Sequence, residues 1–411
     1  PEGGHLHESR YSDPWEAFIH SPRGNLEQLP EQCGDRMASR QQQVRSPTRA
    51  LHGATIQPRA RRWQLVDVLR GIAILLVLCR HHGSTGYLQD FGWLGVDLFF
   101  VLSGFLVSGL VFDEYMRTGA FSGFHFLIRR GFKIYPSFYA LITTTTVLMA
   151  VSGRGDPIMN YIAEVFYFQN YHEGLWVHTW SLAVEEHFYL LLVFAALIMI
   201  GSERRFTFRA FTRICLVLFV AFLGLRIVTS LGSEFTMYGQ FFPTHLRMDS
   251  LLAGVLLAAW HRYRPDDFIA FFRRRRSLLY ACMMLMLLPI LLSPFGSFVM
   301  VTFGLTGAYI AGAIAVGLAV TAIPMDEEHP VHRWLVVPTA WIGGISYTTY
   351  LWHLLVLLIV EMLTSRAHMH GTFVEFVLFA VGSILVGFLT SKVTERPFLR
   401  LRERAFPAKG R

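Results

Sequence analysis

Apolar runs of bilayer-spanning length recur along the chain from Trp63 onward. A helix needs about 20 consecutive apolar residues to cross the hydrocarbon core of a membrane. With 53% hydrophobic and only 16% charged residues, a soluble protein of 411 residues could not cover its surface with polar groups. The sequence therefore predicts an all-α polytopic membrane protein. Ten transmembrane helices are expected, over 64–83, 91–112, 132–151, 179–200, 212–231, 246–260, 277–293, 298–323, 341–363 and 373–393.

The positions of lysine and arginine predict how these spans are oriented. If residues 1–63 lie in the cytoplasm, the segments on that side carry 31 of the 37 basic residues. The loops on the other side carry only Arg154 and Arg366. Cytoplasmic loops of membrane proteins hold such an excess of positive charge. Both termini are therefore expected to be cytoplasmic, and an odd number of spans would break the alternation.

The chain divides into three expected segments. Residues 1–62 are polar and rich in arginine, which predicts a disordered cytoplasmic tail, although an over-long gene model with Met37 as the true start fits equally well. Residues 63–404 form the ten-span domain, and 405–411 form a short cytoplasmic tail. The net charge is +8, but its cations lie between apolar runs, so no nucleic-acid partner is expected. The four cysteines show no paired spacing, so no metal site is expected.

The first span carries ionisable side chains that are costly inside a membrane, at about 2.5–3.5 kcal/mol each near its centre. Arg70 and His81 are eleven positions apart, which leaves about 20° of rotation and ~16.5 Å of rise between them. They therefore share one helix face, and Asp67 stands at the right spacing to pair with Arg70. An arginine that snorkels toward the cytoplasm and a histidine at the interface would explain the same pattern.

Further ionisable residues gather mainly in the outer halves of other expected spans, at the depth of His81. Carboxylates and imidazoles together suit removal of a proton from a hydroxyl, with histidine as general base and a carboxylate to orient it. A salt-bridge network that only holds the helices together is the alternative. The residues are Asp97, Glu185, Glu186, His187, His245, Arg247 and Asp249, with His353 in the ninth span.

Three basic residues stand at the entrance of the third span, on its cytoplasmic side. Arg129, Arg130 and Lys133 stand just before the pair Tyr135-Pro136. Basic side chains in this place are suited to bind the phosphates of a cytosolic donor. They are also ordinary charges of a cytoplasmic loop, so their position alone leaves both interpretations open.

Seven motifs in order, from about Leu65 to Leu401, resemble the bacterial membrane acyltransferase family 3, whose members O-acylate surface and secreted glycans. The first is LVDVLRGIAILLVLCRHHG, in which Arg70 is followed after ten residues by His81. The others are GVDLFFVLSGFLVSGL (95–110), RRGFKIYP (129–136), TWSLAVEEHFYLL (179–191), LRMDSLLAGVLLA (246–258), SYTTYLWH (346–353) and TERPFLRL (394–401).

The chain departs from the family pattern at a few positions. Lys133 stands where arginine is usual, His187 where glutamine is common, and Leu355 where proline is frequent. His82 follows His81, so the base could lie one position further on, although the spacing favours His81. The extracytoplasmic hydrolase-like domain that some members append is not expected after the last span.

The resemblance implies a multi-pass O-acyltransferase of the bacterial inner membrane. It would move an acyl group, acetyl in the common case, from cytosolic acyl-CoA to a hydroxyl of a cell-surface or secreted glycan, with no bound cofactor. The bilayer, acetyl-CoA, the glycan acceptor and proteins of glycan synthesis are the expected partners. A proton-coupled transporter or flippase would explain the buried charges but not the seven motifs.

The same resemblance assigns roles to individual residues. His81 would be the general base or would carry the acyl group itself. Arg70, Asp97 and Glu185 would assist it, and the three basic residues at 129, 130 and 133 would bind the donor. Supporting or acceptor-side roles fall to Asp67, Glu186, Arg247, Asp249, His353 and Glu395.

Overall fold

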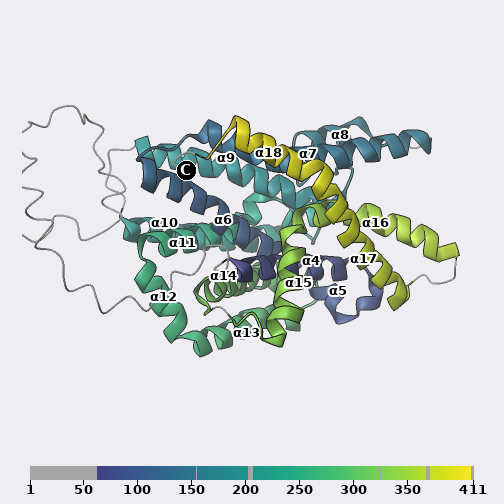
Figure 1. The fold of residues 1–411 in the computed structure, drawn as a ribbon. Coiled ribbons are helices and arrows are strands. Elements are labelled where there is room, and N and C mark those ends of the chain that lie inside the picture. Colours follow the sequence, from purple (N-terminus) through teal and green to yellow (C-terminus); the bar gives the residue numbers. More distant parts are fainter. Residues whose placement is uncertain (1–62, 154, 202–206, 324, 367–370, 409–411) are drawn as a thin grey trace, which may run out of the picture.

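The computed structural model describes residues 63–408, apart from 154, 202–206, 324 and 367–370 (Figure 1). The expected tail over 1–62 and its alternative as an over-long gene model lie outside the described residues, as does the end of the segment 405–411. The described part of the chain is helical and contains no strand.

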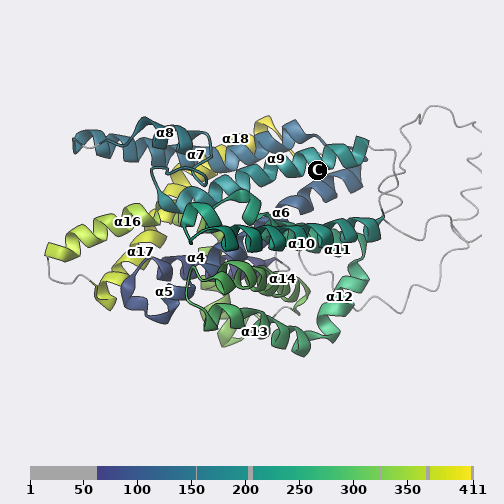
Figure 2. The same ribbon diagram turned by 180° about the vertical axis from the view of Figure 1, so that it is seen from behind.

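The helices follow the expected spans closely. Figures 1 and 2 show α6, α9, α10, α11 and α14 running roughly alongside one another. Short 3₁₀ and π turns join several helices, among them Met300–Gly304 before α14 and Ser391–Glu395 after α17. The helices are α4 (Gln64–Arg80), α5 (Tyr87–Phe91), α6 (Leu94–Thr118), α7 (Gly123–Val151), α8 (Ile158–Val165), α9 (Trp180–Gly201), α10 (Phe208–Gly232), α11 (Met248–Tyr263), α12 (Pro265–Arg274), α13 (Arg276–Leu292), α14 (Leu305–Thr321), α15 (Val337–Gly344), α16 (Ser346–Arg366), α17 (Phe373–Thr390) and α18 (Arg396–Ala405).

Each of the ten expected spans coincides with a helix, but not every helix is long enough to cross a membrane by itself. Within the described residues seven segments are long and apolar enough, or up to eight if α12 and α13, which meet at a bend of 78°, form one span. The helices α4 and α11 fall short, with 17 and 16 residues. The seven are Tyr87–Thr118, Gly123–Val151, Val177–Ile200, Phe208–Gly232, Met300–Thr321, Ser346–Ser365 and Phe373–Ala405.

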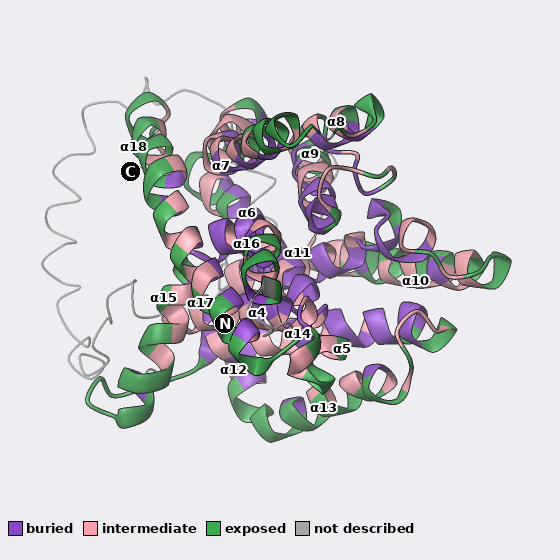
Figure 3. Ribbon diagram, turned by 90° about the vertical axis from the view of Figure 1, so that its right-hand side faces the viewer, coloured by how far each residue is buried: buried purple, intermediate pink, exposed green. Residues whose placement is uncertain are grey.

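The buried core lies where α4, α6, α11 and α14 meet (Figure 3). The helices α6 and α11 approach most closely at Gly104 and Gly254, where an added Cβ would overlap the facing backbone. Small residues allow such close contact between membrane helices, which pack through van der Waals contact rather than through exclusion of water. The short helices α4 and α11 are therefore held in the middle of the bundle.

The outer helices expose apolar side chains, which is the reverse of a soluble protein. Val217, Val220, Val228 and Leu231 of α10 are all more than half exposed. Large exposed apolar surfaces mark contact with a membrane or a partner. Together with the seven span-length helices, this surface makes the chain a multi-pass membrane protein.

Candidate active site

A cavity of about 320 Å³ opens among α4, α6, α7, α9 and α16. Three of its lining side chains are the cations Arg70, Arg130 and Lys133, and Glu185 adds a carboxylate. Most other lining residues are apolar or aromatic. The cavity therefore suits a ligand that has both an anionic and an apolar part. Among the described residues, no group of three histidine, cysteine, aspartate or glutamate side chains is placed to hold a metal ion.

The three basic residues expected in a loop before the third span lie instead within α7, which begins at Gly123. Arg130 and Lys133 are one turn apart on the same helix face and both line the cavity. Arg129 is rotated by about 100° from Arg130 and faces α18. Its Nη2 donates to Oε1 of Glu403 at 3.0 Å. The structure therefore brings two of the three expected donor-binding residues to the cavity.

Arg70 lies on the face of α4 that borders the cavity. Its Nη1 donates to Oδ1 of Asp67 at 3.2 Å, which confirms the pairing expected from their spacing. The carboxylate thus holds the guanidinium from one side and leaves the rest of its planar group directed at the cavity lining. Asp67 does not itself line the cavity.

Two carboxylates of α9 take different positions. Glu185 lines the cavity and accepts hydrogen bonds from Ser103 at 2.8 Å and from Tyr189 at 2.9 Å. Glu186 lies on the next face and accepts from the hydroxyl of Tyr135 at 3.1 Å. Neither carboxylate has a hydrogen bond to His81, so the expectation that Glu185 orients this histidine is not met by a direct contact.

Asp97, which the resemblance gives a role in assisting His81, is bound in an ion pair with Arg247. Its carboxylate receives Nη2 of Arg247 at 2.8 Å and the hydroxyl of Ser250 at 3.1 Å, all buried. The Arg247 guanidinium also lies 4.7 Å from the ring centre of Phe241. Sequence spacing could not show this because the two charges come from helices 150 positions apart.

A second buried ion pair joins Asp249 to Arg226 at 2.6 Å and ties α11 to α10. The buried charges of α6, α10 and α11 therefore form the bundle-holding network that the sequence left open as an alternative. Removing one partner of such a pair costs about 3–5 kcal/mol of stability, because the other charge stays buried without a counter-charge.

Two more of the expected site residues have hydrogen-bond partners of their own. Nδ1 of His187 lies 2.7 Å from the hydroxyl of Thr244. Glu395 accepts a hydrogen bond from Ser391 at 3.2 Å and does not line the cavity.

His81 ends α4 as its C-cap and packs against a ring of α16. Its ring centre lies 5.0 Å from that of His353, which is fully buried. His178, just before α9, lies 4.8 Å from His353 on another side. The ring of Tyr350 is 5.5 Å from both His178 and His353. His178 was not predicted from the sequence, where its only signal is its place directly before the motif that begins at Thr179.

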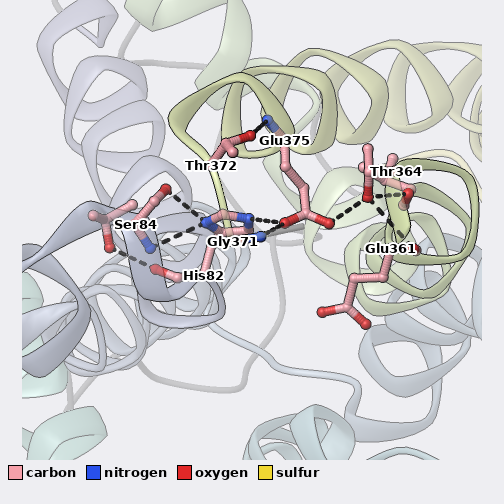
Figure 4. A network of polar contacts seen from close by, with 9 residues as sticks. His82, Ser84, Glu361, Thr364, Gly371, Thr372 and Glu375 are labelled. Carbon is pink, nitrogen blue, oxygen red and sulfur yellow. Dashed lines mark hydrogen bonds and ion pairs between the residues drawn. The ribbon is translucent and has the colours of Figure 1, made fainter. Parts of the chain in front are cut away.

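His82 belongs to a different network, which Figure 4 shows. Its Nε2 donates to Oε2 of Glu375 at 3.1 Å, and its Nδ1 lies 2.8 Å from the hydroxyl of Ser84. Glu375 also accepts from the backbone N–H of Gly371 at 2.6 Å and from the hydroxyl of Thr364 at 2.5 Å. Both ring nitrogens of His82 are thus engaged in joining α4 to α17. The spacing that favours His81 over His82 agrees with this arrangement.

Glu164 of α8 is a buried carboxyl that the sequence did not single out. Its Oε2 accepts from the backbone N–H of Leu175 at 3.0 Å, so it holds the segment before α9 against α8. Burial raises the pKa of Glu164 to about 7, although its hydrogen bonds act in the opposite direction. It lies outside the span-length helices and in no motif, which explains why no pattern revealed it.

The histidine cluster and the cavity are neighbours. Tyr350 lines the cavity with its ring, and its hydroxyl donates to the backbone carbonyl of His178 at 2.7 Å. Ser181, another lining residue, lies 2.6 Å from the same hydroxyl. The cationic cavity and the imidazoles are therefore separated by little more than the side chain of Tyr350.

Comparison with known proteins places this geometry in a family. The family described as "Acyltransferase domain" matches residues 63–392. "Putative O-acetyltransferase SACOL0978" of Staphylococcus aureus (strain COL) is 27% identical over 369 residues, which cover 81% of this chain and 56% of that protein. "O-acetyltransferase OatA" of Staphylococcus aureus (strain NCTC 8325 / PS 47) is 32% identical over 211 residues, covering 47% of this chain and 34% of that protein.

The chain thus spans about half the length of the first of these relatives and about a third of the second. No solved structure matches the chain. The family match extends over all of the motifs except the last and over every helix that lines the cavity. The chain therefore belongs to the membrane acyltransferase family that its motifs resemble.

Proposed function

We propose that the chain is an integral-membrane O-acyltransferase that moves an acetyl group from cytosolic acetyl-CoA to a hydroxyl of a cell-surface or secreted glycan. One observation carries the proposal: the cavity lined by Arg70, Arg130 and Lys133 lies directly beside the histidine cluster. Both relatives are named as O-acetyltransferases, which supports acetyl as the group transferred.

The cations account for binding of the donor. Acyl-CoA carries phosphates, and arginine binds phosphate with two parallel hydrogen bonds while lysine acts as a point charge. Arg130 and Lys133 stand on the same face of α7, and Arg70 faces them from α4. The apolar remainder of the lining would accommodate the pantetheine arm and direct the thioester toward Tyr350 and the histidines.

The reaction needs a base for the acceptor hydroxyl. In direct transfer His81 takes the hydroxyl proton, the oxygen bonds to the acyl carbon, and the carbon–sulfur bond breaks. The departing CoA thiolate then receives the proton from His81. Alternatively His81 attacks the thioester and carries the acyl group before the hydroxyl takes it.

The proposed enzyme lies in the inner membrane of a bacterial cell. It crosses this membrane ten times, and both of its termini are in the cytoplasm. The split of basic residues and the helix at each expected span support it. In this orientation the basic face of α7 meets the cytosolic donor, and the end of α4 with His81 lies toward the outer surface. The ten-span domain covers 63–404, and the donor and acceptor therefore meet inside the bundle.

Thioester turnover tests the proposed function. The purified protein in detergent is incubated with acetyl-CoA, and free CoA is measured with a thiol reagent. We expect slow release of CoA by hydrolysis and none from the His81→Ala variant. A proton-coupled transporter would release no CoA from acetyl-CoA, so the absence of turnover by the wild-type protein would refute the proposal.

A further inference from the structure

Two buried histidines near His81 are held in one defined proton arrangement by backbone carbonyls. Nε2 of His178 donates to the carbonyl oxygen of Leu351 at 3.1 Å. Nδ1 of His353 donates to the carbonyl oxygen of Tyr350. A carbonyl oxygen only accepts, so each of these nitrogens carries a hydrogen. In a neutral ring the other nitrogen is then a bare acceptor.

Those two acceptor nitrogens have no partner. Nδ1 of His178 and Nε2 of His353 are both buried and accept no hydrogen bond within the described residues. Their side chains are only 4% and 0% exposed. A buried acceptor left without a donor lowers stability, so each such group in a native protein calls for an explanation, of which a catalytic role is one. Each nitrogen therefore calls for a nearby N–H or O–H donor.

His81 is a candidate donor. Its ring centre is 5.0 Å from that of His353, and the described residues give the His81 side chain no hydrogen bond that would hold it elsewhere. The carboxylates expected to orient it are engaged elsewhere, since Asp97 binds Arg247 and Glu185 binds Ser103. The position that an orienting carboxylate would occupy is thus taken by imidazoles.

We propose that His353 and His178 are positioning residues that act through His81, an inference that rests on the proposed function. In the active arrangement that we propose, the His81 ring, whose centre lies 5.0 Å from that of His353, shifts so that its N–H is accepted by Nε2 of His353, which has no partner in the structure. The other nitrogen of His81 is then free to take the hydroxyl proton. When His81 becomes the imidazolium, the lone pairs of His353 and His178 stabilise its positive charge.

Neutral acceptors suit this place in the bundle. A carboxylate beside His81 would favour its protonated form before the reaction, and a protonated imidazole cannot act as a base. Imidazoles held by the carbonyls of Leu351 and Tyr350 offer neutral acceptor nitrogens in the cluster that contains His81, without adding a charge. Proton transfer to His81 then creates the charge only when the acceptor hydroxyl attacks the thioester, and the charge disappears when His81 protonates the CoA thiolate.

The two histidines can be tested with the same pair of substitutions in opposite senses, because His353 binds its backbone carbonyl through Nδ1 and His178 binds its own through Nε2. The amide of asparagine lies near Nδ1 of a histidine, and that of glutamine near Nε2. His353→Asn keeps the donor to Tyr350 but loses the acceptor, whereas His353→Gln keeps the acceptor. At the other position the pattern reverses, so His178→Gln keeps the donor to Leu351 and His178→Asn keeps the acceptor.

Release of CoA from acetyl-CoA is measured for the four purified variants and the wild type in detergent. We expect His353→Asn and His178→Gln to lower kcat roughly 10²-fold, within the range for a group that supports proton transfer. The KM for acetyl-CoA should stay unchanged, because neither residue lines the cavity. His353→Gln and His178→Asn should keep at least ~10-fold more turnover than their counterparts.

If the two histidines only stabilise the fold, the opposite pattern is expected. The variants that keep the hydrogen bond to the backbone carbonyl, His353→Asn and His178→Gln, would then be the active ones. That result, or equal turnover of the two variants at either position, would overturn the inference. Thermal unfolding and gel filtration in detergent establish that each variant is folded. A wild-type protein without CoA release would instead refute the proposed function, and the role of these histidines with it.

Discussion

Arg129 donates from Nη2 to Oε1 of Glu403, 3.0 Å away, and so fastens the N-terminal half of α7 to α18. Its neighbour Arg130 faces the cavity instead. Two adjacent arginines of one motif thus serve different purposes, since neighbouring positions on a helix point about 100° apart. One holds the fold and the other is available to a ligand.

This contrast gives a first prediction about the donor. Arg130→Ala should raise the KM for acetyl-CoA about 10-fold or more while kcat changes little, because a charge-assisted hydrogen bond to phosphate is worth about 1.5–3 kcal/mol. Arg129→Ala is the matched control, which should keep the KM and lower the melting temperature slightly. Steady-state CoA release over a range of acetyl-CoA concentrations measures both. An unchanged KM in Arg130→Ala would show that this arginine does not bind the donor and is one of the ordinary positive charges of a membrane protein's cytoplasmic side.

A second prediction concerns the shape of Arg70 rather than its charge. Arg70→Lys keeps the charge beside Asp67 but loses the planar two-pronged donor that lines the cavity. We expect kcat/KM for acetyl-CoA to fall about 10-fold or more, as for loss of one charged hydrogen bond. Arg117→Lys, at an exposed position on α6, should have no effect. Full activity of Arg70→Lys would show that only the positive charge matters.

The third prediction separates His81 from His82. His81→Ala should stay folded and lose at least ~10²-fold in kcat, the smaller end for removal of a general base. His82→Ala should instead lower the melting temperature, because it leaves the carboxylate of Glu375 buried without its imidazole partner. Its turnover per folded molecule should stay near normal. A stable but inactive His82→Ala would place the base one residue further on.

A fourth prediction follows from the buried carboxyl of Glu164. Its pKa of about 7 in the folded protein lies above the ordinary value of 4.5. Between these two pH values the folded protein therefore holds a proton that the unfolded chain has lost. The contribution of this group to stability is full below about pH 4.5 and declines as the pH rises to about 7.

Melting temperatures in detergent, recorded between pH 4.5 and 7.5, test this linkage. The wild-type protein should lose stability with rising pH more steeply than Glu164→Gln, whose amide cannot ionise. The hydrogen bond from the Leu175 N–H can form to either side chain. Parallel curves for the two proteins would show that Glu164 titrates at its ordinary value.

The last prediction concerns topology. In a variant without the native cysteines, Gly155→Cys should react with a membrane-impermeant maleimide in intact cells. Arg209→Cys should react only after the cells are permeabilised, because it lies in the first turn of α10, at the end that the proposed topology places in the cytoplasm. Both positions are exposed, so failure to label reflects the membrane rather than burial. Reversal at either position would refute the proposed orientation.

Much of this architecture follows from local properties of the chain. The positions of the helices could be read from the length of each apolar run, because hydropathy and helix length depend only on nearby residues. The pairing of Asp67 with Arg70 was likewise predictable, since helix geometry places residues three apart on one face. The same periodicity put Arg130 and Lys133 together once they were known to lie in a helix.

Contacts between distant segments had to come from the tertiary structure. Asp97 binds Arg247, whereas the sequence offered several buried charges at one depth with nothing to select among the pairs. His178 and His353 meet although they stand on helices far apart in the chain. Hydropathy places each helix in the membrane, but it does not say which faces of which helices meet. That choice depends on how side chains pack across the whole bundle, and it decided which imidazoles surround His81.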